Sequence, residues 1–502
     1  MNRAARVFGR HVARATDETG RRASAPAAAP GPPGPPGPPR PPRPPEPPVE
    51  VAADAVADGD RSYAPGSARA ALRYPTFRRI YFGAFLSNIG TWMQNVVLGA
   101  LAYDLTGSST FVGIVIFAQL GPMLLLSMVG GLLVDVLDRR RLLVTISLVQ
   151  LVLSFVLAAV VAPGEPNNVT LVALVFALGI AQAFYAPAYA AILPQLVDRE
   201  DLPGAISLNS VQMNASRVIG PVVGAFIDSL LGASAVFASN GVTYLFVVGA
   251  VLTVRLPPPA GRADGAENGV LRRLTSGFAV ARRDPIVGRC LVTLTTFSLL
   301  SLAFIGQLPV VADRNLGIDE RSGAYGALYA CLGVGAVSGA LAIGTVLSQR
   351  SQARISRVAL VGFSVTLAVF ALLRTPAPAY PVVIVLGTMY FALITSLSTI
   401  VQSRIDDHER GRVTALWIMG FAGTVPVGNL IAGPVIEATS VTTVLLVGAA
   451  WALALTAYAR LDDHRAGAGG DGRAGGQAGN SGQAGNGGAA PASPTARPLT
   501  PG

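Results

Sequence analysis

The sequence predicts an all-α polytopic membrane protein with twelve transmembrane helices in two six-helix bundles. Three observations support this fold class. Of the 502 residues, 51% are hydrophobic and only 13% are charged, whereas a soluble protein carries about a quarter charged residues. Apolar runs of roughly 20 residues, the length that crosses a bilayer, recur along the chain. The arginines gather at the edges of these runs, as membrane topology requires.

Both ends of the chain differ in composition from the middle. Residues 1–72 contain the run PGPPGPPGPPRPPRPPEPP and are expected to form a disordered, Pro-rich tail with a stiff polyproline segment. No apolar core follows the early arginines, so we do not expect a signal peptide there. Residues 461–502 are rich in Gly, Ala, Ser and Pro, which predicts a second disordered tail.

Between the tails, the apolar runs form two groups of six. The expected first bundle, residues 73–254, has spans near 80–103, 111–137, 142–162, 169–193, 205–227 and 233–254. The expected second bundle, residues 290–460, has spans near 291–312, 323–347, 355–373, 380–401, 413–436 and 441–458. A polar linker, residues 255–289, separates them and contains VLRRLTSGFAVARRDP, which predicts a short amphipathic helix at the membrane surface.

The arginines also predict the orientation of the spans. One set of loops holds Arg139–Arg141, Arg199, Arg272, Arg273, Arg282, Arg283, Arg350, Arg354, Arg357, Arg404, Arg410 and Arg412, and the other only Arg314, Arg321 and Arg374. Cytoplasmic loops carry the excess of positive charge. We therefore expect a multi-pass protein of a bacterial cytoplasmic membrane, with both tails and the linker in the cytoplasm.

Composition excludes several classes of function. All 38 basic residues are arginine, so the chain has no lysine for a phosphate-binding P-loop, and an ATP-driven pump is not expected. The two cysteines and three histidines form no pattern typical of a metal site or a disulfide framework. No catalytic constellation falls inside the spans, so neither an enzyme nor a cofactor is expected. Because the net charge of +10 follows from topology arginines, nucleic acid is not an expected partner.

The two groups of spans resemble each other weakly. LVDREDLPGAISLNS leads into the fifth span and its Gly220-Pro221, and RIDDHERGRVTALW leads into the eleventh and its Gly433-Pro434. Duplicated halves with a site between them are typical of secondary transporters.

The chain resembles the major facilitator superfamily over about residues 76–460. The loop GGLLVDVLDRRRLL matches that family's loop motif at Gly131, Leu133, Asp135, Arg139, Arg140 and Arg141, and departs from it at Val136 and Asp138. The fifth span resembles the antiporter signature at Gly220, Pro221 and Gly224, with Ala225 in place of the last glycine. The first span, APAYAAILPQLV and NASRVIGP are similar to the siderophore-exporter and macrolide-efflux branch.

The resemblance implies gating roles for these motifs. Asp135 would help to close the cytoplasmic side by capping the eleventh helix near Arg412, where the helix dipole is positive. Arg139 and Arg140 would act with it, although setting topology alone would also explain them. Gly220 and Gly224 allow close helix packing, and Pro221 favours a kink, although such residues are common in membrane helices.

Arg217 is the main candidate for the substrate or coupling site. It shares one helical face with Ser210, Asn214 and the two glycines, and a charge inside a span indicates function. Two partners remain open: amides and carbonyls of the protein, including Asn88, Gln94 and Asn95 of the first span, or an anionic group on the substrate.

Further polar and aromatic side chains predict an amphiphilic cavity. Helical spacing groups Asn88, Trp92 and Asn95 on the first span, Gln182, Tyr185 and Tyr189 on the fourth, and Tyr325 and Tyr329 on the eighth. Packing between helices is the alternative for each of them.

Together these features predict an exporter of a small amphiphilic molecule, such as a drug, a siderophore or a natural product, working by alternating access. The resemblance implies proton antiport, driven by the proton gradient without a cofactor.

Asp104, Asp228, Asp313 and Glu437 lie near outer span ends, and Asp228 and Glu437 are the best coupling candidates by position. The expected partners are the bilayer, the substrate and protons, and the expected state is a monomer. An importer of a nutrient or siderophore, or a non-transporting receptor or scaffold, is the alternative.

Overall fold

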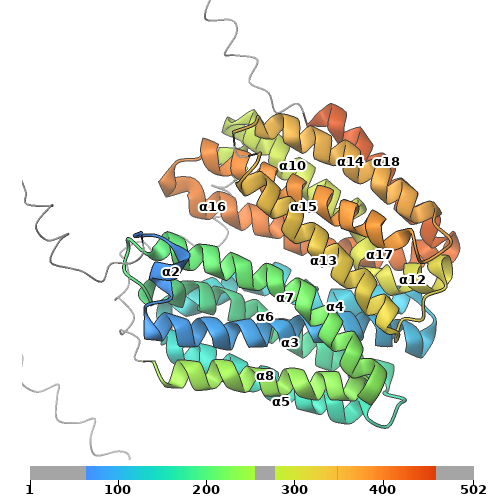
Figure 1. Cartoon of the computed structure of the whole chain (residues 1–502), viewed down its shortest axis with the longest axis horizontal. Helices are drawn as coiled ribbons and strands as arrows, with labels where there is room; N and C mark the ends of the chain where they lie inside the picture. Colours follow the sequence, from blue (N-terminus) through green and yellow to red (C-terminus); the bar gives the residue numbers. More distant parts are fainter. Residues whose placement is uncertain (1–63, 255–277, 348, 460–502) are drawn as a thin grey trace, which may run out of the picture. The chain divides into compact units, whose positions relative to one another are not determined.

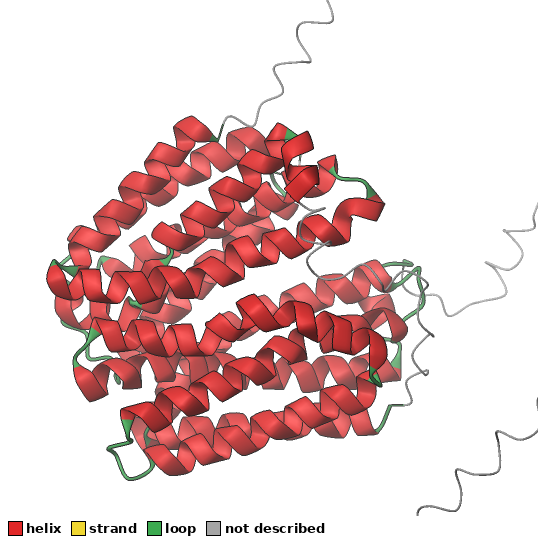
Figure 2. Cartoon of the chain, turned by 180° about the vertical axis from the view of Figure 1, so that it is seen from behind, coloured by secondary structure: helices red, strands yellow, loops and turns green. Residues whose placement is uncertain are grey.

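The computed structural model describes residues 64–254, 278–347 and 349–459. All regular elements among these residues are helices, as Figure 2 shows. The first bundle contains α3 (Pro75–Thr106), α4 (Ser109–Val136), α5 (Arg139–Val161), α6 (Asn168–Ile192), α7 (Leu202–Leu231) and α8 (Ala233–Leu252). The second contains α10 (Pro285–Leu300), α11 (Ala303–Gly306), α12 (Leu308–Leu316), α13 (Gly323–Gly344), α14 (Gln352–Leu372), α15 (Ala379–Arg404), α16 (Asp407–Ile418), η2 (Met419–Gly423), α17 (Thr424–Ala438) and α18 (Val441–Tyr458).

Length and hydropathy identify these helices as membrane spans. Within the described residues, nine helical segments are at least 18 residues long and apolar enough to cross a bilayer. The helices α3, α4 and α7 occupy the remaining three predicted spans. The prediction of an all-α membrane protein with twelve transmembrane helices is therefore confirmed.

The helices pack in the same order within each bundle. In the first bundle α4 packs on α6, while α5 packs on both α6 and α8. In the second, α13 packs on α15, while α14 packs on both α15 and α18. These are the same span positions in each half, so the weak sequence repeat corresponds to a structural repeat.

Two helix pairs make most of the contact between the bundles, α4 with α17 and α7 with α13 (Figure 1). Glycine brings the backbones together in both pairs. A Cβ atom on Gly333 would lie 2.8 Å from the Arg217 carbonyl oxygen, and one on Gly433 would lie 2.6 Å from the Ser109 carbonyl oxygen. Close backbone approach at small residues is the usual basis of helix association in membranes.

Two predicted spans are interrupted. The seventh divides into α10, α11 and α12, and Pro309, which lacks an amide donor, stands in the first turn of α12 after the second break. Gln307, between α11 and α12, donates its side-chain amide to the Ser109 carbonyl of the first bundle at 3.2 Å. The eleventh contains the π-helical turn η2 between α16 and α17, and such turns are frequent at functional sites.

Two predicted boundaries shift. The short helix α2 (Ala68–Ala71) lies inside the expected tail 1–72 and packs on α7. Asp201, just before α7, accepts hydrogen bonds from the Gly66 amide and the Tyr74 hydroxyl, both at 2.9 Å. At the linker, α10 already begins at Pro285, inside the expected segment 255–289. Residues 1–63, 255–277 and 460–502, which include most of both predicted tails, lie outside the described part of the chain.

Replacing Gly333 with Ala should weaken the α7–α13 contact, because the new methyl group meets a backbone oxygen that cannot move aside alone. We expect a lower melting temperature of the purified protein in detergent. The matched control is Gly344→Ala in the same helix, where a Cβ has open space. Equal melting temperatures for the two variants would contradict the packing argument.

Replacing Asp201 with Asn should destabilise the protein by about 1–3 kcal/mol at pH 7, because hydrogen bonds to a charged acceptor are lost. The backbone hydrogen bond from Gly66 holds the pKa of Asp201 below its usual value of 3.8. A depressed pKa stabilises the fold above the unfolded value, and this stabilisation disappears as the pH falls through the folded value.

The free energies of unfolding of Asp201→Asn and the wild type should therefore converge as the pH falls below 3.8. Glu200→Gln, an exposed neighbour, serves as the control and should match the wild type at every pH. A difference between Asp201→Asn and the wild type that persists unchanged in acid would exclude the charge as its cause.

Candidate functional site

The side chain of Arg217 lies at the contact between the bundles. Its guanidinium carbon is 5.4 Å from the centre of the Trp92 ring on α3 and 5.0 Å from that of the Phe391 ring on α15. A cation over an aromatic face is attracted by the ring quadrupole, by about 0.5–2 kcal/mol. The charge is thus held by one ring from each bundle.

Few hydrogen bonds satisfy this guanidinium. One terminal nitrogen donates to the Asn214 side-chain oxygen at a long 3.4 Å. The Nε atom is buried and has no hydrogen-bond partner among the described residues. An unsatisfied buried donor costs about 1–3 kcal/mol, and no carboxylate of the described chain forms an ion pair with Arg217. The site therefore has an unused capacity to bind an anion.

A cavity of about 230 Å³ adjoins Arg217. Residues of both bundles line it: Trp92, Leu120, Arg217, Ile305, Tyr329, Leu332, Gly333, Ala336, Tyr390, Phe391, Phe421 and Val425. Arg217 is the one charged member of this lining, and five of the twelve residues are aromatic. The arrangement suits a small ligand with an apolar body and a group that can accept hydrogen bonds from the arginine.

The structure brings together part of the predicted site. Trp92 and Arg217 line the cavity, and Asn214 contacts Arg217. Ser210 lies one turn before Asn214 in α7, and its hydroxyl donates to the Ile206 carbonyl at 3.1 Å.

The other predicted residues are not part of this lining. Asn95 accepts a hydrogen bond from Gln119 at 2.5 Å, and Gln182 accepts one from Gln150 at 2.9 Å. Tyr185 is buried in the first bundle and stacks on Tyr189, with ring centres 6.1 Å apart. Asn88 is partly buried on α3. The contacts of Asn95, Gln182 and Tyr185 are of the kind that the packing alternative describes.

Sequence reasoning missed the contribution of the second bundle. Tyr390, Phe391 and Phe421 were not singled out, because aromatic residues in an apolar span are indistinguishable from packing residues. The adjacent pair Tyr390-Phe391, whose ring centres lie 4.7 Å apart, was the available signal. Tyr329 belonged to a predicted stripe and does line the cavity.

The glycines of α7 fit this helix against α3. A Cβ on Gly220 would lie 2.9 Å from the Ile89 carbonyl oxygen, and one on Gly224 would lie 3.0 Å from the Met93 Cα. On the opposite side, the Pro221 carbonyl oxygen lies 3.3 Å from the Cβ position of Gly326 on α13. The segment predicted to act in gating is therefore packed between one helix of its own bundle and one of the other.

The loop arginines bind carbonyls of their own bundle. Arg140 donates to the carbonyls of Val251 and Leu252 at the end of α8, at 3.2 and 2.6 Å, and Arg139 donates to the Ala191 carbonyl at 3.4 Å. Asp138, the departure from the family motif, caps α5 by accepting from the Arg141 amide at 2.9 Å. Gly131 and Asp135 belong to α4, but the surroundings of Gly131 and the side chain of Asp135 lie outside the described part, so their gating role stays a prediction.

At one end of the helices, polar side chains link the two bundles. We call this the far end, and its linking residues are Tyr103, Asp104, Gly107, Ser108, Ser109, Thr110, Asp313, Arg314, Arg321, Gly433 and Glu437. Tyr103 donates to Asp313 at 2.7 Å and accepts from Arg314 at 3.1 Å. Arg321 forms an ion pair with Asp104.

Glu437 of α17 caps the first turn of α4 across the bundle contact. Its carboxylate accepts from the Thr110 amide at 3.1 Å, from the Thr110 hydroxyl at 2.7 Å and from the Ser108 hydroxyl. A carboxylate at a helix N-terminus is favoured by the helix dipole. This carboxylate is therefore a clasp between the bundles at the far end.

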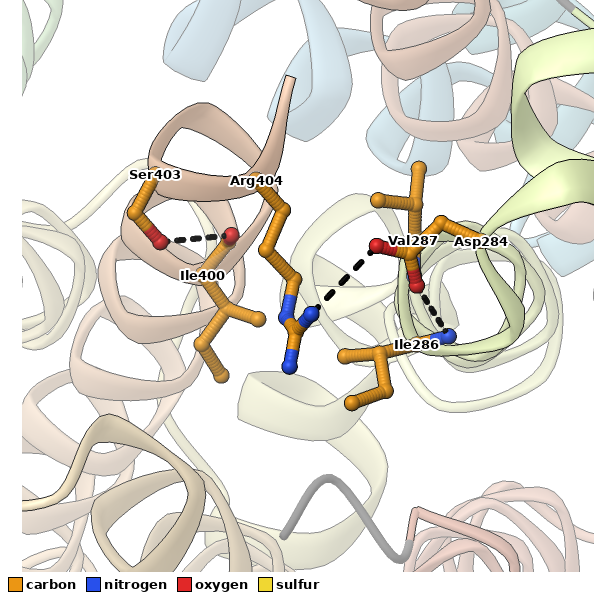
Figure 3. A network of polar contacts seen from close by, with 6 residues as sticks. All are labelled: Asp284, Ile286, Val287, Ile400, Ser403 and Arg404. Atoms are coloured by element: carbon orange, nitrogen blue, oxygen red, sulfur yellow. Dashed lines mark hydrogen bonds and ion pairs between the residues drawn. The ribbon is translucent and has the colours of Figure 1, made fainter. Parts of the chain in front are cut away.

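At the opposite end, the ion pairs of the described side chains stay within the second bundle. Arg404 at the end of α15 contacts Asp284 at 3.4 Å, and Asp284 also caps α10 through the Ile286 amide (Figure 3). Arg283 donates to both oxygens of Glu409, at 2.8 and 2.9 Å. Within the described chain, the hydrogen bonds between bundles therefore concentrate at the far end.

Comparisons with known proteins agree with this architecture. A model of the transmembrane secretion effector family matches residues 66–464. The chain is 24% identical to the staphyloferrin A transporter of Staphylococcus aureus over 355 residues, which are 70% of this chain and 87% of the relative. It is 25% identical to the enterobactin exporter EntS of Shigella boydii over 364 residues, which are 68% of this chain and 81% of the relative.

Solved structures show the same fold. A mutant of the nucleoside transporter NupG aligns with a TM-score of 0.64 and 15% identity, covering 77% of this chain and 99% of that one. A bacterial homologue of the human lysosomal transporter Spinster aligns with a TM-score of 0.53 and 14% identity, covering 77% and 95%.

Replacing Glu437 with Gln should loosen the far end, because it removes the charge that three donors of the first bundle share. Spin labels at Glu165→Cys and Ala377→Cys, in a background with both native cysteines replaced by Ser, would report the separation of the bundles there. We expect a larger population of long distances.

Glu320→Gln makes the same change of charge near the far end and should leave the distances unchanged. An identical distance distribution for Glu437→Gln and the parent protein would show that the carboxylate does not hold the bundles together.

Proposed function

Because the chain belongs to the transmembrane secretion effector family of the major facilitator superfamily, we propose that it exports a small amphiphilic molecule from the bacterial cytoplasm by alternating access, in exchange for protons. The observation that carries this proposal is the Arg217 cavity, which is lined by both bundles. A site at the contact of two repeats is exposed to opposite sides when the repeats rock against each other.

The distribution of polar contacts supports alternating access. Hydrogen bonds and an ion pair link the bundles at the far end. Two helix pairs with glycine contacts, α4–α17 and α7–α13, provide surfaces on which the bundles can rock. Transport then requires that the far-end links break and that new contacts form at the opposite end.

Arginine placement supports the direction of loading. If the arginine-rich loops are cytoplasmic, the far end is the outer end, and it is closed in this structure. The cavity would then take its substrate from the cytoplasm, which is the loading state of an exporter. Both tails would lie in the cytoplasm, and the protein would work as a monomer in the cytoplasmic membrane.

The relatives support a substrate of the siderophore, drug or natural-product type. One is named as a transporter of staphyloferrin A and another as an exporter of enterobactin. The largely apolar lining with one cation suits an amphiphile more than a sugar. The same fold also serves import in general, so direction is part of the test.

Proton coupling would act through the far-end carboxylates, since no carboxylate lines the cavity. Protonation of Glu437 from outside would remove the charge that caps α4 and so weaken the clasp between the bundles. Opening outward and protonation of Glu437 would then be linked, and antiport requires in addition that the proton pass from this carboxylate to the cytoplasmic side before the clasp forms again. Asp228, the other predicted coupling residue, is the alternative carrier within α7.

Everted vesicles containing the protein and a pH-sensitive dye should show proton release from the acidified lumen when a transported compound is added, because antiport exchanges the two. A strain lacking the gene should retain the compound. Vesicles with Glu437→Gln should lose most of the proton flux, and vesicles with Glu320→Gln should keep it. Uptake into intact cells, instead of retention in the deletion strain, would identify an importer.

A further inference from the structure

We propose that the Arg217 cavity selects a small aromatic anion, whose carboxylate or phenolate binds the guanidinium while its ring lies among the aromatic side chains. This inference rests on the proposed function and names the class of substrate.

The charge of the site requires a counter-charge from the ligand. Arg217 has one long hydrogen bond to Asn214 and a buried Nε without a partner in the described chain. A cationic ligand would be repelled, and a neutral apolar ligand would leave the charge uncompensated at a cost. An anion gains a charge-assisted hydrogen bond at an existing cation.

The rings around the guanidinium restrict where that anion can bind. Trp92 and Phe391 both lie over the guanidinium, with their ring centres within 5.4 Å of its central carbon. The N–H donors of a guanidinium point outward in its plane, in a fork that matches a carboxylate. The anionic group therefore binds in the plane of the guanidinium at its terminal N–H donors, since the Nε atom itself is buried.

The dimensions of the cavity limit the body of the ligand. A closed apolar cavity of about 150 Å³ accommodates one benzene molecule. The cavity here measures about 230 Å³, so one ring with an acidic substituent fits, or the arylated end of a larger amphiphile.

The lining favours an aromatic body over an aliphatic one. Tyr390 stacks towards Phe421 with ring centres 6.5 Å apart and meets Phe391 edge-on at 4.7 Å. Tyr329 completes this aromatic wall from α13. An inserted ring gains offset or edge-to-face contacts with such a wall, worth about 0.5–1.5 kcal/mol for each pair beyond burial.

Four ligands of similar size test the proposal by calorimetry on the purified full-length protein. Benzoate carries ring and charge, benzamide lacks the charge, benzylammonium reverses it, and cyclohexanecarboxylate lacks the aromatic ring. We expect benzoate to bind at least tenfold more tightly than benzamide and severalfold more tightly than cyclohexanecarboxylate, with no saturable binding of benzylammonium.

Variants assign the charge effect to Arg217. Arg217→Gln should weaken benzoate at least tenfold and leave benzamide within twofold, and Arg217→Lys should fall between because it keeps the charge without the fork. The control Arg199→Gln removes an exposed cation and should bind like the wild type. Unchanged melting temperatures would show that each variant is folded.

Three results would overturn the proposal: equal binding of benzoate and benzamide, equal binding of benzoate by Arg217→Gln and the wild type, or no saturable benzoate binding to the wild type. The last two would make Arg217 a structural residue. These outcomes are separate from the proposed function, because export and proton flux are measured in vesicles with the transported compound, whereas this binding is measured without a gradient.

Discussion

The close contact of α7 with α13 determines where the guanidinium of Arg217 lies. Gly333 allows α13 to approach the backbone of α7 at the carbonyl of Arg217 itself. On its other side, α7 is fitted to α3 through Gly220 and Gly224. Since glycines allow a close approach on both sides of α7, the guanidinium reaches rings of both bundles. A bulkier residue at any of these glycines would separate the cation from one of its two rings.

The fold was predictable from the sequence because the bilayer imposes it. A backbone in lipid must satisfy its own hydrogen bonds, so apolar runs of sufficient length become helices. The arginine pattern predicted the orientation of the spans, and the Gly-Pro repeat indicated the division into two halves. The break at Pro309 and the turn η2 were not predicted, since each depends on what packs beside it.

Only the part of the site that the first bundle contributes was predictable from the sequence. A single arginine within a span is conspicuous, and Trp92 shares a helical stripe with polar residues, so the sequence predicts both as candidates, and both line the cavity. Tyr390 and Phe391 are ordinary members of an apolar span, and only the approach of the second bundle gives them a role. Conversely, Gln182 and Tyr185 looked like cavity residues but bind neighbours in their own bundle.

The hydrogen bond between Tyr74 and Asp201 has a consequence for the two rings that hold the guanidinium. Tyr74, at the start of α3, donates to Asp201, at the start of α7, and the glycines of α7 hold the same two helices together further along. Trp92 and Arg217 thus belong to one rigid pair, whereas Phe391 belongs to the other bundle. If the bundles part as proposed, the arginine would keep its tryptophan and leave its phenylalanine, so its affinity for an anion would differ between the two states. Release of cargo would then be built into the same side chain that captures it.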